Sequence, residues 1–193
     1  TARVKGLLPL RNKSLNDLNS ILAKKPRSIL RELAVEINKN SATQVAVTSS
    51  RAKMTANDLA RALSCYMQSD MMKIAIVDFS SKAKKLDVDD EKLSIEPFFV
   101  AESTGYLSIL KPKGDLEAIE MLSQKSFWEN TQSLNSNFNL VFLCADNNNA
   151  ISLLNALEGK KMLHITLART KKTKSTTLTQ MRSLLPIHGL LHD

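Results

Sequence analysis

Residues 44–48 read QVAVT, a short run of apolar and branched side chains, and the polar turn after them leads into a helical pattern. The same arrangement returns at 73–78 (KIAIVD), 139–145 (NLVFLCA) and 162–167 (MLHITL). Strands that are apolar on both faces and alternate with helices are typical of a parallel sheet covered on both sides. We therefore predict an α/β fold in three layers, with a mostly parallel sheet between two layers of helices.

The other expected elements complete this layout. Apolar residues at helical spacing predict helices, and shorter apolar runs predict strands. A length of 193 residues fits one domain, which we divide into an N-terminal linker with helices, residues 1–43, and a core, residues 44–193. The helices are expected over 15–22, 26–37, 55–68, 116–134, 150–157 and 176–185, and further strands over 97–101, 106–110 and 187–191.

Composition limits the classes of function. The formal net charge is +8, but only 5% of residues are aromatic and the cations form no stripe with interleaved aromatic side chains, so we expect no binding of nucleic acid. The two cysteines, Cys65 and Cys144, lie in separate apolar stretches, which predicts no disulfide framework and no metal site and favours a reducing cytoplasm. No segment is apolar over the roughly 20 residues that a membrane helix requires.

The turn after the first core strand, residues 48–55 (TSSRAKMT), lies where a parallel sheet usually binds its ligand. A turn that cradles phosphate requires glycine, because several backbone N–H groups must converge on the phosphate oxygens. None of the five glycines of the chain lies in this turn, and the turn is short. We therefore expect no bound cofactor.

A weakened nucleotide site is the alternative. Its candidate residues are Ser50, Lys53, Thr55, Asp78 and Asp146. Lys53 and Thr55 imitate the end of a phosphate-binding G-K-[ST] signature, and Asp78 is the residual catalytic candidate. Cys144 occupies the position at which a Mg²⁺-binding aspartate is expected, and a thiol is a poor ligand for Mg²⁺. ATP or ADP with Mg²⁺ would bind only if this site still works, and Thr55 and Asp78 equally fit simpler roles as caps of a helix and a turn.

Cations follow three of the predicted strands. If the sheet is parallel, they all project from one edge, where they form a surface for an anionic partner, either an acidic protein segment or a lipid surface. A solvated rim without a partner is the alternative. The partner-binding candidates are Arg51, Lys82, Lys84, Lys85, Arg169, Lys171, Lys172 and Lys174.

The order of these segments resembles the cytoplasmic domain of the bacterial tyrosine kinases (BY-kinases) that accompany polysaccharide co-polymerases. The similarity covers nearly the whole chain and consists of short collinear motifs at fitting spacing. In this resemblance Glu32 belongs to a partner-binding helix that joins subunits, although Val35 and Asn38 stand where the family has arginines. The similar segments are 6–9 (GLLP), 26–32 (PRSILRE), 44–50 (QVAVTSS), 74–78 (IAIVD), 107–114 (LSILKPKG), 138–144 (FNLVFLC) and 169–174 (RTKKTK).

The resemblance implies a P-loop NTPase-like core and a role in the production of exopolysaccharide or capsule. It places the domain on the cytoplasmic side of the bacterial inner membrane, attached to the membrane-spanning co-polymerase portion of its own chain and assembled as a homo-oligomer. Because the phosphate-binding glycines and the Mg²⁺ aspartate are absent, the resemblance implies a pseudokinase scaffold. Two alternatives stay open: an active ATP-binding tyrosine autokinase of the same family, and a P-loop relative of the partition or septum type.

Overall fold

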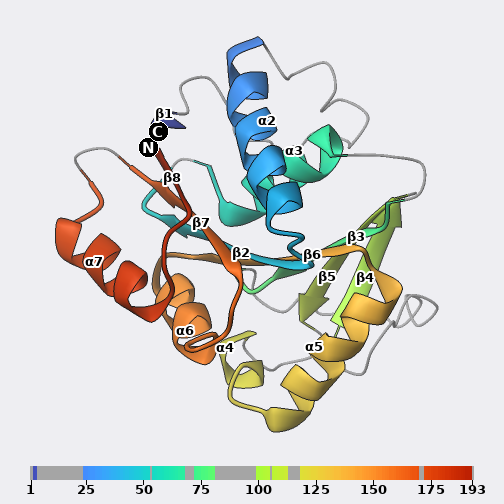
Figure 1. The fold of residues 1–193 in the computed structure, drawn as a ribbon. Coiled ribbons are helices and arrows are strands. Elements are labelled where there is room, and N and C mark those ends of the chain that lie inside the picture. The colour runs from blue at the N-terminus through green and yellow to red at the C-terminus, as the bar shows by residue number, and fades with distance from the viewer. Residues whose placement is uncertain are drawn as a thin grey trace.

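A computed structural model describes residues 2–3, 24–52, 54–67, 72–80, 99–104, 106–112, 118–169 and 172–192. Within them, strands form one eight-stranded sheet in the order β1-β8-β7-β2-β6-β3-β5-β4 (Figure 1). All neighbouring strands are parallel except β4 and β5. The strands are β1 (Ala2–Arg3), β2 (Gln44–Ser50), β3 (Ile74–Asp78), β4 (Phe99–Thr104), β5 (Leu107–Pro112), β6 (Leu140–Asp146), β7 (Leu163–Ala168) and β8 (Gly189–His192).

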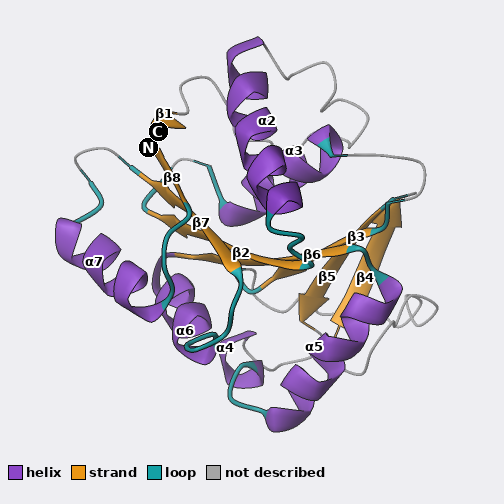
Figure 2. Ribbon diagram, in the orientation of Figure 1, coloured by secondary structure: helices purple, strands orange, loops and turns teal. Residues whose placement is uncertain are grey.

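Helices cover both faces of this sheet, so the predicted three-layer α/β fold is confirmed (Figure 2). Helices α2 and α3 pack on one face and α4 to α7 on the other. No helix in the described part of the chain has the length and apolar character that crossing a membrane requires. The helices are α2 (Lys24–Lys39), α3 (Ala56–Tyr66), α4 (Ala118–Met121), α5 (Lys125–Asn137), α6 (Asn147–Ala156) and α7 (Ser175–Leu184).

The sheet has an apolar core on each side because successive strand residues point to opposite faces. In β6, Phe142 and Cys144 face α3, whereas Val141 and Leu143 face the layer of α4 to α7. All four side chains are fully buried. This explains why the central strands are apolar throughout rather than alternating with polar residues.

Helix α2 shows the expected helical spacing on its buried side. Leu30, Ala34 and Ile37 are buried at intervals of four and three residues, while Glu32 and Val35 are exposed on the other side. The helix begins at Lys24, two residues before the proline that was expected to open it. Proline is tolerated there because the first turn of a helix lacks acceptors for its N–H groups.

The prediction of one long helix over 116–134 is wrong, because residues 122–124 interrupt the helix and separate α4 from α5. The indole Nε1 of Trp128 donates a hydrogen bond to the Leu122 carbonyl (2.9 Å), and the Ser123 hydroxyl donates to the Glu120 carbonyl (2.7 Å). These bonds use carbonyls that a continuous helix would have bonded to its own backbone. The break turns α5 back along the sheet toward β6.

The N-terminal segment also differs from expectation. Residues 1–43 were expected to hold a linker and helices, yet Ala2 and Arg3 form a strand that pairs in parallel with Leu191 and His192. Both ends of the described chain therefore lie side by side at one edge of the sheet (Figure 1). The helix expected over 15–22 lies outside the described residues.

Candidate functional site at the carboxyl edge of the sheet

Parallel strands β2, β3, β6 and β7 all end at one edge of the sheet, which we call the carboxyl edge. The chain leaves β2 there, at residues 51–52, and reaches α3 through residues 54–55. Asp78 ends β3 and Asp146 ends β6, where Asp146 is level with Ser49 of β2. The structure thus brings together Ser50, Thr55, Asp78 and Asp146 of the predicted site, and Lys53 lies outside the described residues.

The first turn of α3 is where a phosphate would meet backbone N–H groups. Thr55 and Asp58 form a capping box: the Asp58 N–H donates to the Thr55 hydroxyl (3.0 Å), and the Thr55 N–H donates to the Asp58 carboxylate (3.1 Å). The Ala56 N–H donates to Oδ1 of Asp146 (2.8 Å). Three N–H groups that a phosphate would need therefore already have acceptors within the protein.

The last residue of β6 and the first turn of α6 tie the carboxyl edge together through three side chains. Besides Asp146 at the start of α3, Asn147 accepts from the Arg51 N–H (2.9 Å), and Asn149 donates to the Phe79 carbonyl (2.8 Å). We call these three residues, Asp146, Asn147 and Asn149, the asparagine clasp, after the two asparagines among them. The clasp joins the turn after β2, the start of α3 and the turn after β3, which are the segments that would surround a bound nucleotide.

The turn after β2 is held in an unusual backbone conformation. Arg51 has φ 53° and Asn147, its partner in the clasp, has φ 50°. Asparagine tolerates this left-handed region, but for arginine it costs about 1–2 kcal/mol. The hydrogen bond to Asn147 offsets part of this strain, in a turn where a phosphate-binding loop would use glycine.

Asp78 is held by protein groups on both of its carboxylate oxygens. Oδ2 accepts from the Asn57 side-chain amide (2.6 Å) and Oδ1 accepts from the Ser80 N–H (2.9 Å). Arg61 in turn donates to the oxygen of Asn57 (2.8 Å). The carboxylate is only 7% exposed, so it acts as a buried acceptor within a connected network.

Asp146, rather than Cys144, supplies the carboxylate of β6 to the carboxyl edge. Burial raises the pKa of Asp146 and the nearby Asp78 raises it further, while the Ala56 N–H and the Ser49 hydroxyl lower it. Burial, followed by the charges of Asp78 and Asp146, raises the pKa of the Cys144 thiol well above its usual range. The thiol thus stays protonated within the core and supplies no ligand for Mg²⁺.

Two of the three predicted groups of cations meet at the carboxyl edge. The Ser50 carbonyl accepts hydrogen bonds from the Arg169 N–H (3.4 Å) and the Thr173 hydroxyl (2.6 Å), which joins the turn after β7 to the turn that carries Arg51. Arg51, Lys172 and Lys174 are exposed, and Arg169 is half-buried. Lys82, Lys84, Lys85 and Lys171 lie outside the described residues, and Glu32 is on α2, away from these contacts.

Solved structures match this fold over nearly the whole chain. The crystal structure of the chimerical protein CapA2B2 has a TM-score of 0.66 at 14% identity, covering 96% of this chain and 92% of that chain. The kinase domain of the Escherichia coli tyrosine kinase ETK has a TM-score of 0.65 at 10% identity, covering 95% and 80%. The chain has the fold of a bacterial tyrosine kinase domain.

A further kinase-domain structure agrees. The BceF tyrosine kinase domain has a TM-score of 0.59 at 12% identity and covers 98% of this chain and 81% of that chain. No protein-family model and no curated protein matches the sequence. The similarity to bacterial tyrosine kinase domains therefore rests on the arrangement of the elements in space.

A bacterial tyrosine kinase fold implies ATP with Mg²⁺ at the carboxyl edge, and the residues here do not fit that pair. The N–H groups of Arg51, Thr55, Ala56 and Asp58 are bonded to side-chain oxygens. Both carboxylate oxygens of Asp78 accept hydrogen bonds from the protein. No three His, Cys, Asp or Glu side chains gather as metal ligands among the residues that the structure describes.

Proposed function

We propose that this chain is a pseudokinase scaffold, the cytoplasmic domain of a co-polymerase protein for exopolysaccharide or capsule. The observation that carries the proposal is the asparagine clasp. In a nucleotide-dependent domain, phosphate groups hold the turns of the carboxyl edge together. Here Asp146, Asn147 and Asn149 hold the same turns with hydrogen bonds of 2.8–2.9 Å.

The clasp makes the order of this edge independent of a ligand. A hydrogen bond within a protein contributes about 0.5–1.5 kcal/mol of stability, and three such bonds link segments that are far apart in sequence. The clasp residues are part of the chain, so the edge keeps one conformation at any nucleotide concentration. A constant surface suits a domain that organises partners rather than one that turns over substrate.

The cations of the carboxyl edge provide the partner surface of this scaffold. Arg51, Lys172 and Lys174 are exposed there beside the half-buried Arg169. We expect them to attract an acidic protein segment or an anionic lipid surface at the cytoplasmic side of the inner membrane. Assembly into a homo-oligomer through the exposed side of α2, which includes Glu32, and attachment to the membrane-spanning portion of the same chain belong to the same proposal.

Thermal unfolding with Mg-ATP and Mg-ADP tests this function. A ligand at 100 times its Kd stabilises a protein by about 2.7 kcal/mol, which gives a clear rise in Tm. We expect no rise at millimolar nucleotide, and no phosphotyrosine after incubation with Mg-ATP. The ETK kinase domain serves as the positive control. A saturable rise in Tm, or phosphate on Tyr66 or Tyr106, would overturn the scaffold in favour of an active kinase.

A further inference from the structure

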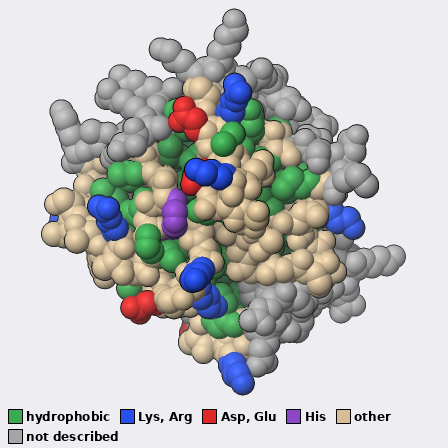
Figure 3. Space-filling view, viewed as in Figure 1, with side chains coloured by type: hydrophobic (Ala, Val, Ile, Leu, Met, Phe, Trp, Pro, Cys, Tyr) green, Lys and Arg blue, Asp and Glu red, His purple; other side chains and the backbone are tan. Residues whose placement is uncertain are grey.

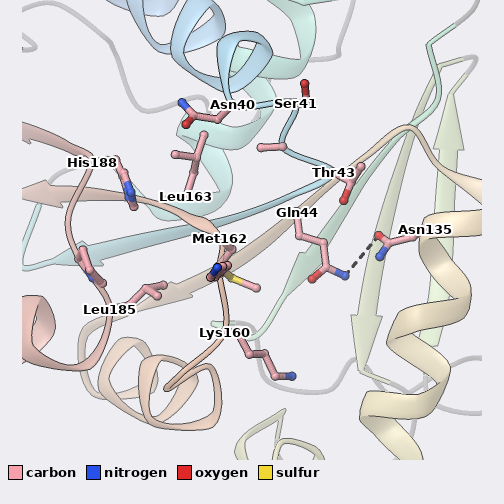
Figure 4. A pocket seen from close by; sticks show the side chains of 13 residues that line it. Asn40, Ser41, Thr43, Gln44, Asn135, Lys160, Met162, Leu163, Leu185 and His188 are labelled. Carbon is pink, nitrogen blue, oxygen red and sulfur yellow. Dashed lines mark hydrogen bonds between the residues drawn. The ribbon is translucent and has the colours of Figure 1, made fainter.

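A pocket of about 500 Å³ opens at the opposite edge of the sheet, where the parallel strands begin (Figure 4). It lies between the segments that lead into β2, β7 and β8, residues 40–44, 160–163 and 185–188, with Asn135 of α5 on one side. All three segments end helices or turns and start strands, so the pocket is separated from the carboxyl edge by the full length of the strands. A volume of this size accommodates a small organic molecule.

The residues that line the pocket carry positive and no negative charge. Lys160 and Lys161 are among the lining residues and none of these is Asp or Glu, while the lining residue Asn40 donates a hydrogen bond to the Glu36 carboxylate (2.9 Å). The Lys160 ammonium lies 3.6 Å from the centre of the Trp128 ring, and burial lowers the pKa of Lys160. The Lys160 ammonium is therefore held against Trp128, which does not line the pocket, and Lys161 is the lining cation that we assign to a ligand. Figure 3 shows one face of the molecule, on which Lys or Arg, His and apolar side chains lie together with a few Asp or Glu side chains.

Polar side chains of the pocket present fixed hydrogen-bond donors. The His164 N–H donates to Nδ1 of His188 (3.1 Å), so the neutral His188 ring carries its proton on Nε2 as a donor. The Gln44 amide donates to Oδ1 of Asn135 (3.2 Å), which leaves the NH₂ group of Asn135 to donate elsewhere. Met162, Leu163 and Leu185 add apolar surface.

We propose that this pocket binds a small organic anion whose phosphate or carboxylate oxygens meet Lys161 and His188. The amide groups of Asn135 and Gln44 bind hydroxyl or carbonyl groups of the ligand, and the apolar side chains pack against its carbon skeleton. Lys161 and the Nε2 donor of His188, with no Asp or Glu among the lining residues, favour an anionic ligand over a cationic or a purely apolar one. This inference is independent of the proposed scaffold function, because it concerns the edge at which the fold holds no nucleotide.

Titration followed by ¹H–¹⁵N NMR tests the proposal, with inorganic phosphate, glycerol 3-phosphate, citrate and uncharged glycerol as probes. We expect saturable shifts of the amides of Asn135, Lys161 and His188 with at least one anion, and none with glycerol. A response to glycerol 3-phosphate or phosphate assigns a phosphorylated ligand, and a response to citrate alone assigns a carboxylate. No saturable shift with any anion, or an equal response to glycerol, would overturn the proposal.

Charge-removing variants locate the site. Lys161 is exposed and Lys161→Met removes its charge without disturbing the core, while Lys125→Met removes an exposed cation at the start of α5 as the matched control. We expect Lys161→Met to weaken anion binding at least about fivefold and Lys125→Met to leave it unchanged, because a charged hydrogen bond is lost only in the first. Equal affinities of the two variants would show that the anion binds elsewhere and would refute the site.

Discussion

His164 is a titratable ring sealed inside the sheet, with 0% of its surface exposed. Its Nδ1 lies 3.1 Å from the Leu185 carbonyl, which only accepts, so Nδ1 carries the proton. Its Nε2 therefore accepts, and it lies 2.8 Å from the hydroxyls of both Thr48 and Thr166. Both nitrogens of the neutral ring thus have a hydrogen-bond partner. If Nε2 also carried a proton, it could no longer accept, and the hydroxyl groups of Thr48 and Thr166 would have to reorient.

Burial of this ring makes the fold sensitive to acid. Burial lowers the pKa of His164 to about 4; the Leu185 carbonyl raises it and His188 lowers it. The unfolded chain binds the proton near pH 6.5, so stability is complete above that pH and is lost as the pH falls toward 4. We predict that the free energy of unfolding falls by about 2 kcal/mol from pH 7 to pH 5, because the His164 side chain takes up a proton in the unfolded chain and not in the folded one.

Urea unfolding at pH 7 and pH 5 measures this loss, and His164→Gln isolates it from the contributions of other titrating groups. The variant is expected to lose less stability than the natural chain over the same interval, even if it is less stable at pH 7. An identical loss in both proteins would mean that His164 is not the residue that senses acid.

At the same scale, sequence alone predicted which residues gather at the carboxyl edge but not what they do there. Ser50, Thr55, Asp78 and Asp146 each follow or end a strand, and a parallel sheet must bring such positions together. Alternation places Cys144 and Asp146 on the same face, so the sequence did not reveal which of them reaches α3. Asn149 was missed because asparagines after a strand ordinarily predict only a turn.

Among the elements, the first turn of α6 is the one whose side-chain contacts are easiest to remove one at a time. Asn149 donates to the Phe79 carbonyl (2.8 Å), whereas its neighbour Asn148 is exposed. We predict that Asn149→Ala lowers the free energy of unfolding by about 1 kcal/mol, because one partly buried hydrogen bond is lost. Asn148→Ala, a matched control in the same helical turn, is expected to change it by less than about 0.5 kcal/mol.

Urea unfolding of the two variants gives these values, and amide hydrogen exchange adds a local readout. Exchange near Phe79 is expected to speed up in Asn149→Ala alone, because the turn after β3 loses its tie to α6. If both alanine variants behave alike, the clasp contributes nothing to the order of the carboxyl edge.

Helical spacing predicted the existence of most elements but not where one of them breaks. The pattern over 116–134 reads as continuous because apolar residues recur at helical intervals throughout it. The break depends on the Trp128 indole reaching the Leu122 carbonyl, a contact between a side chain and a backbone group that periodicity does not encode. The strands were easier to predict, since burial on both faces leaves few residue types that fit.

For the molecule as a whole, the sheet separates two apolar cores that respond independently to substitution. Ile37 of α2 is buried on one face and Leu153 of α6 on the other. We predict losses in the free energy of unfolding of about 0.5–1.5 kcal/mol for Ile37→Val and about 2–5 kcal/mol for Leu153→Ala. The double variant should lose the sum within about 0.5 kcal/mol, because the two side chains belong to separate core clusters on opposite faces of the sheet.

Denaturant unfolding of both single variants and the double variant checks this additivity. A deviation well above 0.5 kcal/mol would show that the two cores are coupled through the sheet. The slope of the unfolding free energy with denaturant should stay constant across the set, which confirms that stability rather than the unfolded state has changed.

The pairing of β1 with β8 has a topological consequence. Because Ala2 lies beside Leu191, a few flexible residues suffice to join the two ends into a covalent ring. New ends opened at the exposed turn around Ser123 would then give a circular permutant that retains every strand neighbour of the sheet. Such a rearranged chain offers a way to present either face of the molecule to a surface or a fused partner without redesigning its interior.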